Sequence, residues 1–98
     1  MEKGTPHCRL PVVRALVEAG KVRSTYSALS GAAALGFDFD AMLVIVKALK
    51  TADFYKSMTT HADHHLWQDV YRPTTSAGRV YLKLMVTDDL LIVSFKEL

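Results

Sequence analysis

The last fifth of the chain carries two β-strand patterns on either side of a short acidic turn, and no other feature constrains the fold as strongly. Apolar residues alternate with other residues over 80–87 and again over 90–96, with 88–89 between them. A two-residue loop pairs Thr87 with Leu90, and every later pair keeps the same sum of residue numbers. The sequence therefore predicts a β-hairpin whose register can be counted.

The counted register separates the hairpin into an apolar face and a polar face. Leu84 is expected opposite Val93 on the apolar face. Tyr81 is expected opposite Lys96 on the other face, with Lys83 nearby. A phenol facing an ammonium group on the open side of a small sheet is a candidate for a chemical site.

Short amphipathic helices are expected in the first part of the chain. Residues 10–20 have the apolar spacing of a helix, with Pro11 in its first turn and Gly20 at its C-terminal cap. A second helix follows a cap at Ser24 or Thr25, runs through Leu35 and is ended by Gly36. These helices precede all of the main strands.

The middle of the chain changes from a helical to an alternating apolar period. A third helix over 41–50, begun at Asp38 or Asp40, is apolar on so many sides that we expect it to be mostly buried and to lie across the sheet. Strands are predicted over 54–59 and 66–72. Helices followed by an antiparallel meander of about four strands predict an α+β fold.

The length and composition indicate one domain over 1–98. Half of the residues are hydrophobic, and no apolar run approaches the roughly 20 residues of a membrane-spanning helix. Cys8 is the only cysteine, which excludes an internal disulfide framework and a multi-cysteine zinc site. The N-terminus has no signal-peptide pattern, so we expect a cytoplasmic protein.

Extending the register to the other strands collects basic side chains on one face. Pairing of 54–59 with 66–72 about Ala62 puts Lys56 opposite Gln68, and closure of the next connector puts Gln68 opposite Lys83. A slip of one residue pairs Lys56 with Asp69 instead. The face without a carboxylate is then expected to carry Lys56, Gln68, Arg72, Tyr81, Lys83 and Lys96.

This combination of side chains suits phosphate chemistry. A guanidinium can clamp a phosphate through two hydrogen bonds, and lysines act as point charges toward it. Cations beside a phenol or an amine favour its deprotonated form, which suits proton transfer. Tyr55, Trp67 and Tyr71 offer flat surfaces for unpaired RNA bases, although Trp67 and Tyr71 are also typical core residues of a small sheet.

The histidine-rich segment 61–65 has the composition of a metal site but not a convincing spacing. A tight loop rarely points several ligands at one centre, and nothing elsewhere supplies the missing ligands. We expect Asp63 to organise the turn, with His64 or His65 exposed, and we expect no metal site.

Several segments spread along the whole chain form one recognisable set. They are Met1-Glu2-Lys3, Thr5-Pro6-His7, Arg9-Leu10, 53–60, Asp63-His64, 67–73, 80–83 and 91–97. Together they resemble the MqsR family, the motility quorum-sensing regulator toxins of bacterial type II toxin–antitoxin systems. The resemblance runs from end to end, and its departures are mainly in the helices and in the extra histidines His61 and His65.

The resemblance implies a RelE-like ribonuclease that cuts messenger RNA without the ribosome, at short GC-containing sites. Its active-site residues fall on Lys56, Gln68, Tyr81 and Lys96 of this sequence. Contacts to RNA are expected from Tyr55, Met58, Arg72 and Lys83. No cofactor is expected.

The resemblance also implies a protein partner. A cognate MqsA-type antitoxin, with a zinc-binding N-terminal part and a helix-turn-helix C-terminal part, would bind and silence the chain. DNA would then be contacted only through the antitoxin. A non-catalytic RNA- or protein-binding module that uses the same basic face, and a purely structural interaction domain, remain the alternatives.

Overall fold

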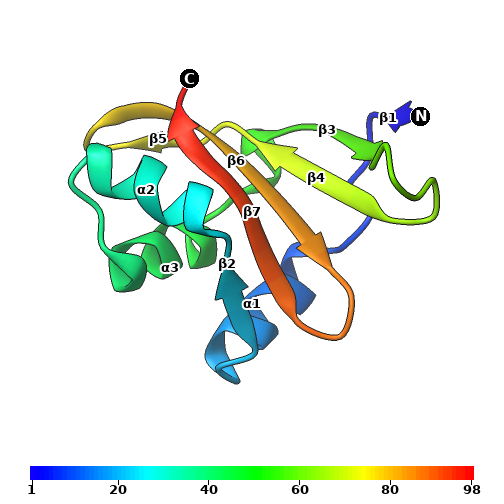
Figure 1. The fold of residues 1–98 in the computed structure, drawn as a ribbon, viewed down its shortest axis with the longest axis horizontal. Helices are drawn as coiled ribbons and strands as arrows, with labels where there is room; N and C mark the ends of the chain where they lie inside the picture. The colour runs from blue at the N-terminus through cyan, green and yellow to red at the C-terminus, as the bar shows by residue number, and fades with distance from the viewer.

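Three helices pack against the apolar face of one twisted sheet in the computed structural model, which describes residues 1–98 (Figure 1). The elements are β1 (Glu2–Lys3), α1 (Leu10–Glu18), β2 (Val22–Ser24), α2 (Tyr26–Ala34), α3 (Phe39–Lys47), the 3₁₀ turn η1 (Thr51–Asp53), β3 (Phe54–Thr59), β4 (Trp67–Tyr71), β5 (Thr74–Thr75), β6 (Gly78–Val86) and β7 (Leu90–Glu97). The predicted α+β class, with helices first and strands after them, is confirmed.

The sheet contains the expected meander and additional short strands. Its order is β1-β3-β4-β6-β7-β2, and β5 pairs with β6. β1 adds antiparallel to β3, whereas β2 adds parallel to β7 at the other edge (Figure 1). The N-terminal residues therefore reach the sheet and become its outermost strand.

The hairpin register is correct at its open end and wrong near its turn. Tyr81 faces Lys96, as predicted. Leu84, however, faces Ile92 rather than Val93, because the connection between the paired strands has three residues instead of two. A β-bulge then restores the predicted register from Lys83 onward, since one extra residue on β7 compensates for the longer turn. The predicted Thr87–Leu90 pair is also wrong: Leu90 pairs with Val86.

The other two registers differ from the predictions by two residues. Lys56 faces Val70, and Val70 faces Lys83, so Gln68 is opposite neither lysine. The loop is centred on Asp63 instead of Ala62, because Asp63 exchanges two hydrogen bonds with Thr60. A shift of two residues leaves Lys56, Gln68 and Lys83 on their predicted face, since alternation has a period of two. Phe54, predicted on the same face as Lys56, packs against the core instead, because the register shifts between these two residues.

The helix that packs most closely on the sheet is α2, so the expectation for the third helix is wrong. α2 is rich in Ala, Ser and Gly, and a Cβ atom added at Gly31 would lie only 1.9 Å from the backbone oxygen of Phe95. α3 packs mainly against α1 and α2 and fully buries Met42 and Val46, while Val44 is 64% exposed. Small side chains thus decide which helix can approach β7.

Caps at the helix ends agree with the sequence. Thr25 accepts a hydrogen bond from the amide of Ala28 at 3.0 Å, and Asp38 accepts one from Ala41 at 2.8 Å. Gly20 has a φ of 74°, which favours glycine at the end of α1. No single helix is long and apolar enough to cross a membrane, although α2 and α3 together pass that test as a pair bent by 92°.

A buried carboxylate fixes the segment that follows β1. Asp69 is 4% exposed and accepts hydrogen bonds from the backbone amides of His7 and Cys8, both at 2.9 Å. The same segment covers Trp67, because the ring of His7 stacks on it at 5.6 Å and the ammonium of Lys3 lies 4.0 Å from its centre. The first residues are therefore tied to β3 and β4.

Candidate active site

The face of the sheet opposite the helices carries a row of basic side chains across three strands. Lys56 on β3 and Lys83 on β6 lie on either side of Val70 in β4, which is completely buried. Val70 lies outside the main apolar core, so the lysine stems on its two sides are well placed to cover it. Both lysine residues remain partly exposed.

Tyr81 lies one row further along the same face, between two cations. Its ring centre is 5.1 Å from the Lys96 ammonium on β7 and 5.7 Å from that of Lys83. The predicted juxtaposition of the phenol with Lys96 is confirmed. A phenol held this close to two ammonium groups is well placed to exchange a proton with a bound anion.

The charge environment makes Lys83 different from its neighbours. Burial lowers the pKa of Lys83, and the charges of Lys96 and Lys56 lower it further. Lys83 thus carries its proton less tightly than an ordinary lysine.

Arg72 and Tyr55 form a flat platform at one end of the basic row. The guanidinium carbon of Arg72 lies 3.5 Å from the ring centre of Tyr55, and Tyr55 is 44% exposed. The β3–β4 register shifts between Phe54 and Lys56, so Tyr55 occupies a β-bulge. This bulge lets Phe54 pack against the core while Lys56 points to the open face, which strict alternation does not allow.

Gln68 and Met58 lie at the other end of the face. They pair with each other across β3 and β4. Gln68 lies beside the Met85 end of β6, because Asp69 faces Leu84. Tyr81 is four residues away along that strand, or about 13 Å. The structure therefore brings Tyr81, Lys83, Lys96 and Lys56 together and leaves Gln68 two side-chain rows from the phenol.

One residue of this face was missed in the sequence. Glu2 on β1 lies opposite Met58, and its carboxylate oxygen is 2.6 Å from the Lys56 ammonium. The hydrogen bond between them lowers the pKa of Glu2 and raises that of Lys56. A two-residue strand has no periodicity to detect, so only the end-to-end resemblance to a family pointed to these first residues.

Two aromatic residues proposed for base stacking are not on this face. Tyr71 is 1% exposed and packs edge-on against Phe54 in the core. Trp67 lies on the helix side and is covered by Lys3 and His7. The prediction that Trp67 and Tyr71 are open stacking surfaces is therefore wrong. Side chains alternate along β4, so these two point away from the face that carries Gln68 and Val70.

Comparisons with known proteins agree with the resemblance seen in the sequence. The family model described as "Motility quorum-sensing regulator, toxin of MqsA" matches residues 5–97. The chain belongs to the MqsR toxin family. It is 60% identical over 97 residues to the mRNA interferase toxin MqsR of Escherichia coli (strain K12), and the match covers 99% of each chain.

The histidine segment of this MqsR-family chain is organised as a turn. Asp63 accepts a hydrogen bond from the backbone amide of His65 at 2.8 Å, and its oxygen also lies 3.2 Å from the His65 ring nitrogen. His64 and His65 are exposed, as expected. The structure gathers no group of three His, Cys, Asp or Glu side chains that could hold a metal ion.

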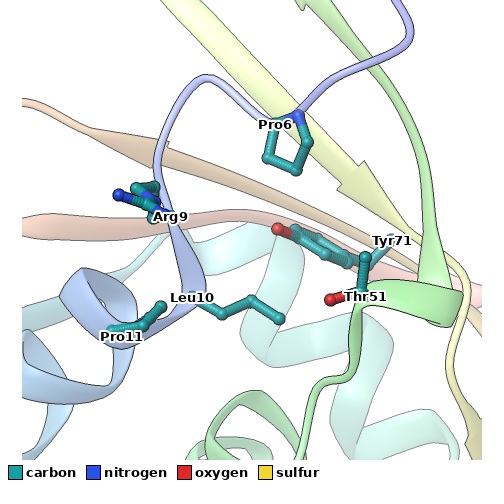
Figure 2. A pocket seen from close by; sticks show the side chains of 6 residues that line it. All are labelled: Pro6, Arg9, Leu10, Pro11, Thr51 and Tyr71. Carbon is teal, nitrogen blue, oxygen red and sulfur yellow. The ribbon is translucent and has the colours of Figure 1, made fainter.

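Two hollows of the molecule lie away from the basic face. One of about 350 Å³ is on the helix side, where the Tyr71 ring lies between Pro6 and Leu10 (Figure 2). The Tyr71 hydroxyl is buried without a hydrogen-bond partner, and burial raises its pKa. Cys8 also has a pKa raised by burial and by Asp69, which makes it a poor nucleophile.

Proposed function

We propose that this chain is the toxin of a type II toxin–antitoxin module and acts as an mRNA interferase, an endoribonuclease that cuts messenger RNA without the ribosome. One observation carries the proposal: Tyr81 lies between Lys83 and Lys96 on an open face, in a chain 60% identical to an mRNA interferase toxin. Neither hollow of the molecule is lined by these residues, and an open basic face can accept a polymer running across it.

The reaction we propose uses the substrate's own 2′-hydroxyl as the nucleophile. Its oxygen attacks the neighbouring phosphorus and loses its proton, while the 5′-oxygen leaves and gains one. The products are a 2′,3′-cyclic phosphate, or the 3′-phosphate formed when water opens it, and a 5′-hydroxyl. The protein must therefore move protons and stabilise a dianionic phosphorane without any metal.

The side chains divide these tasks according to their surroundings. Lys56 has a raised pKa and stays charged, which suits stabilisation of the phosphorane, and Arg72 adds a second cation. Tyr81 transfers the proton, and Lys96 adds positive charge beside it. Gln68 lies two side-chain rows from Tyr81, so it holds the ribose or phosphate of a flanking nucleotide instead of the reacting group.

RNA binding is assigned to the two ends of the same face. The Tyr55–Arg72 platform offers an exposed flat surface on which an unpaired base can stack. Lys83 supplies a further phosphate contact, and Met58 an apolar one beside Gln68. This division is compatible with selection of a short GC-containing site.

The proposed partner is an antitoxin of the MqsA type. We assign the zinc-binding and helix-turn-helix parts to that protein, so this chain would reach DNA only through it. The matched family is described as the toxin of MqsA, which supports such a pair. The pair would act in the bacterial cytoplasm, where messenger RNA is found.

Incubation with a defined transcript in excess EDTA, followed by mapping of both new ends, tests the function. We expect cuts that leave 5′-hydroxyl ends, and loss of cutting in Lys56→Ala. The matched control is Lys47→Ala, which removes an exposed lysine from α3 on the helix side and should cut like the parent. Protection of RNA without new ends would contradict the proposal and favour a binding module.

A further inference from the structure

The basic face contains a single carboxylate, and it comes from the first strand. Glu2 is on the same side of the sheet as Met58 and Gln68, as the pairing of β1 with β3 and of β3 with β4 requires. Its Oε1 atom lies 2.6 Å from Nζ of Lys56. The side chain of Lys56 is 31% exposed and that of Glu2 is 60% exposed, so the pair is open to solvent and to substrate.

The backbone of Glu2 is held in place on both sides. The N-terminal ammonium of Met1 donates to Oγ1 of Thr59 at 3.0 Å, and the amide of Thr59 donates to the carbonyl of Met1 at 2.9 Å. Beyond β1, Asp69 binds the amides of His7 and Cys8. Because its backbone is fixed, the Glu2 carboxylate can hold the flexible side chain of Lys56 in one position.

Glu2 holds Lys56 on a face that carries other cations, and the charge of Lys56 lowers the pKa of Lys83, as expected for two ammonium groups that repel each other. Lys83 and Lys96 place two further cations on the same face, close to Tyr81. A lysine side chain has four rotatable bonds, so repulsion would displace its ammonium group away from the phenol. One of its three N–H donors is directed to Glu2, which leaves two for substrate phosphate oxygens.

We infer that Glu2 is a positioning residue of the proposed ribonuclease site, whose carboxylate holds the Lys56 ammonium where the scissile phosphate is bound. This inference depends on the proposed function. The alternative is that Glu2 competes with the substrate phosphate for the Lys56 ammonium and so blocks substrate binding, which we call a gate. Positioning predicts a loss of kcat when the carboxylate is removed, whereas a gate predicts a lower KM and an equal or higher kcat.

Single-turnover and steady-state cleavage of one transcript by the parent and by Glu2→Gln distinguishes the two. We expect kcat to fall about tenfold while KM changes less than about threefold, because a displaced catalytic group costs rate more than binding. Glu18→Gln is the matched control, since it removes an exposed carboxylate at the end of α1 and should leave both constants unchanged.

A direct measurement on Lys56 adds a readout that a structural role would not change. In an NMR titration of the lysine side chains, the pKa of Lys56 should be lower in Glu2→Gln than in the parent and unchanged in Glu18→Gln. Glu2→Asp keeps the charge but shortens the reach by one methylene, so its kcat should lie between those of the parent and Glu2→Gln, and it replaces Glu2→Gln should that variant fold poorly.

The outcomes separate failure of this inference from failure of the proposed function. A parent that cuts RNA and a Glu2→Gln variant with the same kcat, or with a lower KM and undiminished kcat, would overturn the positioning role alone. An unchanged pKa of Lys56 in that variant would also overturn it. A parent that leaves RNA intact would overturn the proposed function, and the positioning role with it.

Discussion

Replacing Asp69 by Asn should loosen the N-terminal segment and lower the stability of the whole domain. Asp69 is 4% exposed, and each of its two oxygens accepts one backbone amide hydrogen bond at 2.9 Å, from His7 and Cys8. Asn keeps one acceptor but turns an N–H₂ group toward the other amide. One charge-assisted bond, worth roughly 1.5–3 kcal/mol, is thus lost and the other is weakened.

The expected loss in free energy of unfolding is about 2 kcal/mol, because water can reach the partly exposed donor amides and replace part of the bond. For a domain of this size that corresponds to a fall in Tm of roughly 8–16 °C. Urea unfolding followed by circular dichroism measures the free energy, and hydrogen exchange should show faster exchange at His7 and Cys8. Asp88→Asn, in the exposed hairpin turn, is the control. A loss below about 0.5 kcal/mol, with both amides still protected, would refute the reasoning.

Two further substitutions and one metal titration test other parts of the molecule. Gly31→Ala brings a Cβ to 1.9 Å from the Phe95 oxygen, so urea unfolding should show a net loss of about 2 kcal/mol despite the better helix propensity of Ala. Lys83→Met removes a cation whose pKa burial and Lys96 lower. Just below pH 10.5, the ordinary pKa of a lysine, the folded state therefore binds fewer protons than the unfolded state. The charged Lys83 thus destabilises the fold at pH 7, so the variant should have a higher Tm there, and the difference in Tm should shrink as the pH approaches 10.5. The variant should also cleave RNA more weakly. Calorimetric titration of zinc at neutral pH should find no site tighter than micromolar at 61–65; nanomolar binding would contradict the turn assigned to this segment.

The face that carries the basic residues was predictable from the sequence, whereas several pairings, and the faces of Val93 and Phe54, were not. Lys56 and Lys83 stay on one face when the strand register changes by an even number of residues, as it does here. Tyr81 was correctly placed opposite Lys96 because a longer turn and a bulge on β7 offset each other. Neither the longer turn nor the bulge can be predicted from local residue preferences.

Features that depend on tertiary contacts could not be predicted from the sequence. The helix against the sheet is set by the absence of a side chain at Gly31, although apolar content favoured the third helix. Glu2 joins the site through a strand of two residues, too short to show a period. Tyr55 occupies a bulge that changes the direction of Lys56 relative to Phe54. Each of these is decided by a partner far along the chain.

The most direct test of the central claim is the cleavage rate of Tyr81→Phe on a defined transcript in EDTA. Tyr26→Phe is the control, since Tyr26 is 84% exposed on α2, which packs on the side of the sheet opposite the basic face. We expect Tyr81→Phe to lose about 10²–10⁴-fold in single-turnover rate while its thermal unfolding matches that of the parent, because only the proton-transferring hydroxyl is removed. Cleavage by Tyr81→Phe at the parental rate, with the same ends, would contradict the assignment of this face as a ribonuclease site built around Tyr81.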